Sequence, residues 1–91
     1  MNYLVSFYYD CEEDINSATY VAIRGKLEDL SPQTWIQVFP NLLLIQSDLD
    51  IKDIYSEVDS VSQNKRFIVT EITNPKVNEL RSDMLITKLG Y

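Results

Sequence analysis

The chain has 91 residues, of which 45% are apolar and 24% charged, so its length suits one folded domain rather than two. Its 14 acidic and 8 basic residues give a net charge of −6, which disfavours a nucleic-acid partner and favours a basic one. Apolar runs such as Leu42 to Ile45 are too short to span a bilayer, and no secretory leader is recognisable. We therefore expect a cytoplasmic protein outside the membrane.

The first stretch rich in strand-forming residues is Tyr3 to Asp10. Both of its faces are largely apolar, which predicts a central strand covered on both sides. It ends in Asp10, and the acids that follow, Glu12, Glu13 and Asp14, predict a solvated loop.

A helix is predicted next, beginning at Asn16 or Ser17. If Asn16 is the N-cap, Ile15 and Tyr20 form a hydrophobic staple. Ser31-Pro32 ends the helix. Spacings of three, four and three place one apolar stripe towards the core, formed by Tyr20, Ile23, Leu27 and Leu30.

A hairpin, a second helix and a last strand follow. Thr34 to Phe39 and Leu42 to Gln46 are rich in branched and aromatic residues, and Pro40-Asn41 predicts the tight turn between them. Asp50 is typical of an N-cap, and Arg66 to Ile72 predicts the last strand. The second helix again has apolar residues at spacings of three, four and three: Ile51, Ile54, Val58 and Val61.

The order strand, helix, strand, strand, helix, strand predicts an α+β, ferredoxin-like domain over residues 1–73. In this fold a four-stranded antiparallel sheet carries both helices on one face, and its first and third strands are central. Residues 74–91 are expected to form a C-terminal extension, with a helix from Asn74-Pro75 and a strand-like segment from Met84 to Leu89. Because two helices cover only one sheet face, we expect a partner subunit to cover the other, in a homodimer to which Met84 to Leu89 contribute.

Several of these stretches resemble a known family. The strand Tyr3 to Asp10, the segment Thr34-Trp35-Ile36, the acid-led helix after Ser47-Asp48 and the strand Phe67 to Ile72 look like those of small SinR-like proteins. Those proteins are similar to CRISPR-associated protein two. The resemblance covers residues 1 to about 73 and implies a ferredoxin-like homodimer. It also implies a metal-ligand role in nuclease activity for the aspartate that ends the first strand, here Asp10.

The sequence contains no histidine, which excludes histidine-based nucleophile activation and the commonest zinc ligand. Carboxylate chemistry remains, in which Asp10 would be the catalytic and metal-binding residue and hold Mg²⁺. The alternative is that Asp10 only stabilises the turn after its strand. Cys11 lies beside acids that raise a thiol pKa, so we interpret it as an ordinary free thiol.

The second helix contains a candidate binding surface, the acidic stripe of Asp50, Asp53 and Glu57. Acids near a helix N-terminus are stabilised by the helix dipole, which accounts for the first two but not for Glu57. The stripe is either an ordinary solvated face or a contact surface for a basic protein. The basic residues are too few and scattered for a nucleic-acid footprint.

Two functions remain open. The first is a small acidic dimeric binding or regulatory protein without a cofactor, comparable to the regulators and inhibitors carried by mobile elements. The second is a Mg²⁺-dependent nuclease built on the paired Asp10 carboxylates of a symmetric dimer. Exposed strand aromatics would favour nucleic acid, because they can stack on bases. The net charge of −6 favours the first function.

Overall fold

The computed structural model describes residues 1–14 and 16–91, so the predicted staple of Ile15 on Tyr20 lies outside the described residues. The predicted order of strands and helices is confirmed, with one short helix added after the first strand. In chain order the elements are β1 (Asn2–Phe7), α1 (Cys11–Asp14), α2 (Ala18–Leu30), β2 (Ile36–Phe39), β3 (Leu42–Gln46), α3 (Ile51–Ser62), β4 (Phe67–Glu71) and α4 (Leu80–Leu89).

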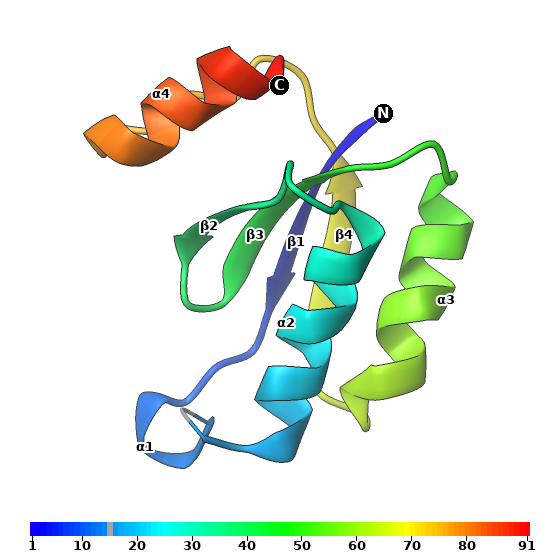
Figure 1. Cartoon of the computed structure of the whole chain (residues 1–91). Helices are drawn as coiled ribbons and strands as arrows, with labels where there is room; N and C mark the ends of the chain where they lie inside the picture. Colours follow the sequence, from blue (N-terminus) through cyan, green and yellow to red (C-terminus); the bar gives the residue numbers. More distant parts are fainter. Residues whose placement is uncertain (15) are drawn as a thin grey trace.

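The four strands form one antiparallel sheet in the order β2-β3-β1-β4. The first and third strands are therefore central, as the sequence predicts for a ferredoxin-like α+β fold. Figure 1 shows α2 and α3 side by side in front of this sheet, with α4 apart from them and nearest to β2. The outer strands β2 and β4 each leave one edge of the sheet free.

The main core lies between the sheet and the two long helices. Alternate residues of β1, namely Tyr3, Val5 and Phe7, are buried there, because successive strand side chains point to opposite faces. The predicted stripe of α2 is buried at Ile23 and Leu27. The other residues that bury their side chains in this core are Tyr20, Leu43, Ile45, Ile54 and Val58.

Two serines, Ser17 and Ser31, mark the ends of α2. The Ser17 hydroxyl accepts a hydrogen bond from the backbone N–H of Tyr20 at 3.1 Å, so Ser17 rather than Asn16 is the N-cap. Ser31 ends the helix and is buried, and its hydroxyl accepts from the N–H of Gln46 in β3 at 2.9 Å. β2 begins later than predicted, because the N–H groups of Thr34 and Trp35 both donate to the Ser31 carbonyl at 3.1 Å. The strand predicted from Thr34 thus begins at Ile36.

The C-terminal extension is helical where a strand-like end was predicted, so that part of the prediction is wrong. Glu79, not the Asn74-Pro75 pair, is the N-cap of α4, and the segment Met84 to Leu89 lies within this helix. The reason is its packing, because Ile86 is buried against Ile36 and Leu44 on the sheet face away from α2 and α3. Helical spacing is what brings the apolar residues of the extension to this face.

Two hydrogen bonds hold the end of α4 to the rest of the chain. The Tyr91 hydroxyl donates to the carbonyl oxygen of Thr34 at 2.6 Å, and Nε2 of Gln46 donates to the carbonyl of Leu89 at 2.9 Å. The extension therefore covers its own sheet over β2 and β3 and packs on its own domain. Beyond this cover large apolar side chains stay exposed: Ile68 and Phe39 from the sheet, and Leu80 and Met84 from α4.

Candidate functional site

Asp10 lies in the loop after β1 and begins α1. Its Oδ1 accepts the backbone N–H of Glu12 at 3.0 Å, and its carbonyl oxygen accepts those of Glu13 and Asp14 at 3.1 and 2.7 Å. These are the bonds of a residue that starts a turn or helix. These contacts are those of the turn alternative, and the metal-ligand alternative stays a prediction.

Asp14 is not solvated as the loop prediction expects, because its side chain is buried in a network of polar contacts. Oδ2 accepts the Asp10 N–H at 2.8 Å and lies 2.9 Å from Nζ of Lys65, while the Ser17 hydroxyl donates to Oδ1 at 3.4 Å. The Asp10 N–H and then Lys65 hold the pKa of the Asp14 carboxyl below its ordinary value. Glu12 and Glu13 are exposed as predicted, and so is the thiol of Cys11.

The Asp14–Lys65 pair ties the loop after β1 to the turn between α3 and β4. Nζ of Lys65 also lies 5.3 Å from the centre of the Tyr8 ring. A shallow hollow of about 560 Å³ lies beside the pair, with Asn64 and Arg66 in its wall. The signal that could have pointed to this pair is topological, since the loop after β1 and the turn before β4 must meet at the same end of an antiparallel pair.

The three acids of the predicted stripe have different surroundings. Asp50 is exposed and is the N-cap of α3, accepting the N–H of Asp53 at 3.0 Å. Asp53 is exposed as well. Glu57 lies at the boundary with α2, where its Oε2 is 3.1 Å from Nζ of Lys26. The stripe is therefore open to a partner at its first two positions and engaged within the chain at the third.

Large apolar side chains are exposed among these acids at the start of α3. The exposed fraction is 38% for Leu49, 42% for Ile51 and 52% for Tyr55. The Tyr55 ring packs against that of Phe67 in β4, with the two centroids 5.2 Å apart. Apolar surface beside charged groups is the composition of many protein contact surfaces. We use the name α3 surface for residues 48–55, whose exposed members are Asp48, Leu49, Asp50, Ile51, Lys52, Asp53 and Tyr55.

The strand aromatics do not form a platform for bases. Tyr3 and Phe7 are buried in the core beneath α2 and α3, and Trp35 and Phe67 are packed against the same core. Phe39 in β2, by contrast, is mostly exposed. Two of the basic side chains, Lys26 and Lys65, are paired with acids.

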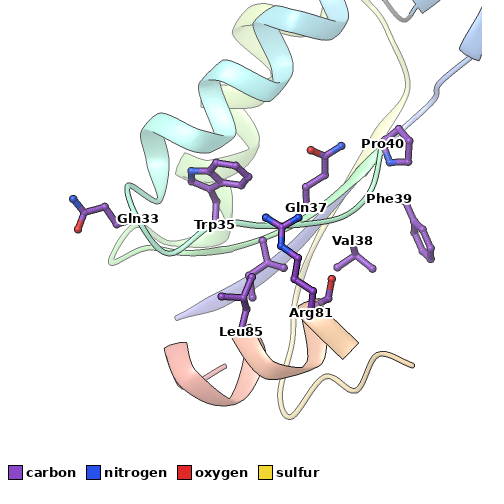
Figure 2. A pocket seen from close by; sticks show the side chains of 10 residues that line it. Gln33, Trp35, Gln37, Val38, Phe39, Pro40, Arg81 and Leu85 are labelled. Carbon is purple, nitrogen blue, oxygen red and sulfur yellow. The ribbon is translucent and has the colours of Figure 1, made fainter. Parts of the chain in front are cut away.

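A second concave region lies between β2 and α4. This groove has a volume of about 440 Å³, and Trp35, Gln37 and Leu85 are among the residues in its wall. Figure 2 shows the Arg81 side chain reaching from α4 towards β2, alongside Gln37. No carboxylate of the described residues lies within ion-pair distance of Arg81. The groove combines one guanidinium with amide and apolar side chains, a set suited to polar binding rather than to acid-base catalysis.

Comparisons with known proteins add no identification. The chain matches no family model, and no curated protein or solved structure matches it significantly. The resemblance to SinR-like proteins stays a prediction. Within residues 1–14 and 16–91, no three side chains of the metal-ligating types Asp, Glu, Cys and His gather as a metal-binding group. None of the described helices is both long enough and apolar enough to cross a bilayer.

Proposed function

We propose that this protein is a small acidic binding protein, acting as a homodimer, that regulates a basic protein partner by occupying its surface. The observation that carries the proposal is the α3 surface, where three exposed aspartates lie beside exposed apolar side chains. Acidic groups steer a basic partner towards the surface, and apolar groups contribute to the complex once they are covered. One lysine, Lys52, is the single basic residue in this segment.

The overall charge supports the same partner class. A net charge of −6 on 91 residues attracts basic proteins and repels phosphate backbones at low ionic strength. The metal-dependent nuclease receives less support, because the contacts of Asp10 are those of a residue that begins α1. The binding function is therefore preferred over the enzymatic one.

Charge reversal at the α3 surface tests the proposal. Asp48→Lys combined with Asp53→Lys changes two exposed carboxylates and spares the Asp50 cap and the Glu57–Lys26 pair. The basic protein recovered with the wild-type chain is titrated against this variant and the wild type by calorimetry at several salt concentrations. We expect affinity to fall by roughly tenfold or more, because repulsion replaces attraction across the interface. The difference should shrink as salt rises.

A matched control separates local from overall charge. Asp29→Lys combined with Asp59→Lys reverses two other exposed acids and changes the net charge by the same amount. We expect this control to retain most of the affinity. Equal losses in both variants would show that only net charge matters, and no loss in either would exclude the α3 surface as the contact site.

A further inference from the structure

The free edge of β4 presents unpaired backbone groups at known positions. The N–H of Tyr8 donates to the carbonyl of Arg66 at 2.8 Å, and the N–H of Ile72 donates to that of Asn2 at 2.9 Å. In an antiparallel pair these groups alternate along the strand. The even-numbered residues 66 to 72 therefore turn their backbone groups towards β1. The N–H and C=O groups of Phe67, Val69 and Glu71 point outwards from the sheet.

The two free edges of the sheet differ in how well they are protected. In β2 the register shifts between Gln37 and Phe39, Pro40 follows directly, and α4 packs beside the strand. Such bulges, prolines and covering elements are the usual means of preventing edge pairing. In β4 the pairing with β1 is regular from Phe67 to Glu71, and this segment contains no proline or lysine. The β4 edge is thus the one that can accept another strand.

Apolar side chains lie on both faces of this edge. Ile68 is 59% exposed on the face that α4 leaves uncovered. On the other face Tyr55 is 52% exposed and stacks on Phe67. A strand added here would remove both apolar groups from water, which contributes about 25 cal/mol for each Å² that is covered. We call residues 67–71 together with Tyr55 the β4 edge.

The charges along the strand indicate which strand is added. The exposed Arg66 precedes β4, next to Lys65, which is already paired with Asp14, and Glu71 ends the strand. When two copies of this strand run antiparallel, the basic end of each lies beside the acidic end of the other. Parallel copies would bring like charges together. The β4 edge is therefore complementary to itself in the antiparallel direction.

We propose that the β4 edge docks β4 of a second copy of this chain, with a two-fold axis passing at Ile68. Residues whose backbone N–H and C=O groups point away from β1 must pair with residues of the same kind in the second copy. This register sets Phe67 opposite Val69 of the second copy. It also places the two exposed Ile68 side chains against each other, which a register centred on Val69 does not. The two sheets then continue into one another.

This inference deepens the homodimer of the proposed function and rests on it. It leaves the acids of the α3 surface accessible, because Glu57, one helical turn beyond Asp53, faces α2 and Lys26 rather than the β4 edge. Tyr55 belongs to both surfaces and would be covered in the dimer, so each dimer would offer its partners two α3 surfaces formed by residues 48–53. Residues of α4 take no part in this interface.

Disulfide trapping tests the register. Opposed residues in a non-hydrogen-bonded antiparallel pair have Cα atoms about 4.5 Å apart, which lies within disulfide range. Ile68→Cys is made in a Cys11→Ser background, because Cys11 is exposed and would otherwise react. Mild oxidation should convert most of this variant to a covalent dimer. Thr70→Cys, two residues along the strand, and Gln37→Cys, on the β2 edge, are the matched controls and should stay largely uncrosslinked.

Sedimentation analysis tests the dimer without a cross-link. We expect the wild type to be a dimer and Ile68→Lys to be a monomer with an unchanged circular dichroism spectrum, because Ile68 is exposed and a charge at an edge opposes pairing. Gln37→Lys on the β2 edge is the control and should stay dimeric. A monomeric wild type, or a dimer that crosslinks through Gln37→Cys instead of Ile68→Cys, would overturn the inference.

The outcomes separate this inference from the proposed function. If Ile68→Lys is monomeric and still binds the basic partner at each α3 surface, both stand. If the wild type dimerises through another edge, only the β4 inference fails. If the wild type is monomeric and Asp48→Lys with Asp53→Lys still weakens partner binding, the dimer is wrong and the acidic contact surface stands.

Discussion

Asp10 and Asp14 show how two acids in one short loop acquire different roles. Asp10 has its Oδ1 on the N–H of Glu12, at the start of α1. Asp14, four residues later, is buried and reaches Lys65 across the end of the sheet. Removing one member of such a buried pair leaves the other charge poorly compensated, so Asp14 is the residue of this loop on which stability depends.

Substitutions at Asp10 distinguish a capping carboxylate from a metal ligand. Asp10→Ala should lower the free energy of unfolding by about 1 kcal/mol, whereas Asp10→Asn should be nearly neutral because asparagine caps equally well. Urea unfolding measures both values. Both variants should keep partner binding, since Asp10 lies outside the α3 surface.

The same variants test the nuclease alternative. We expect no cleavage of single-stranded or duplex nucleic acid by the wild type with Mg²⁺ or Mn²⁺ above that of a mock preparation. Cleavage that is present in the wild type and lost in Asp10→Asn at unchanged melting temperature would establish the nuclease instead.

At the scale of elements, α4 covers part of the sheet face that the sequence analysis assigned to a partner subunit. Its buried residue Ile86 contacts Ile36 and Leu44, and Leu85 and Leu89 pack around them. Its opposite side exposes Leu80 and Met84. The helix thus has one side committed to its own sheet and one side in water.

This two-sided arrangement predicts unequal effects of two alanine substitutions in α4. Ile86→Ala should lower the free energy of unfolding by about 2–5 kcal/mol, because it leaves a cavity above β2 and β3. Met84→Ala, at an exposed position of the same helix, should change it by less than about 0.5 kcal/mol. Urea denaturation measures both, and equal effects would contradict the packing of α4 described above.

At the scale of the whole molecule, three carboxyl groups link stability to pH. Hydrogen bonds lower the pKa of each carboxyl group. The main donor is the Asp10 N–H for Asp14, the Ser82 hydroxyl for Glu79 and the Lys76 ammonium for Asp83. Two of them, Glu79 and Asp83, belong to the first turn of α4 or its cap. Acidification should therefore loosen both the loop after β1 and the C-terminal helix.

The sign of the pH dependence follows from these lowered values. With a folded-state pKa below the unfolded value of about 4, the unfolded chain binds more protons, so the stabilisation is complete above pH 4 and is lost as pH falls through the folded pKa. Urea midpoints measured from pH 7 to the acid limit should be constant at first and then decline. Asp14→Asn should reduce the slope of that decline, while Asp59→Asn, at an exposed site, should not. Equal slopes in all three proteins would contradict the assignment.

Local pattern in the sequence was sufficient for the order of the elements and for most of the core. Apolar spacing identified the buried face of α2 and, at Ile54 and Val58, that of α3, and branched residues identified β3 at its observed bounds. The prediction was wrong for Ile51, which is exposed in the first turn of α3. The Asp50 cap was also predictable, because a cap bonds within its own first turn. The acids of the candidate site could therefore be assigned to α3 from the amino-acid sequence alone.

Only the tertiary structure decided which of these residues are exposed and which are paired within the chain. Lys65 and Asp14 are 51 positions apart, and Glu57 and Lys26 are 31 apart, so no local pattern reveals either pair. The same applies to α4, whose apolar residues fit a strand or a helix until the face of β2 and β3 is available to cover. The free edge of β4 likewise exists only once β1 has paired with it. Periodicity records which side of an element is apolar, whereas long-range pairing depends on chain closure that brings distant residues together.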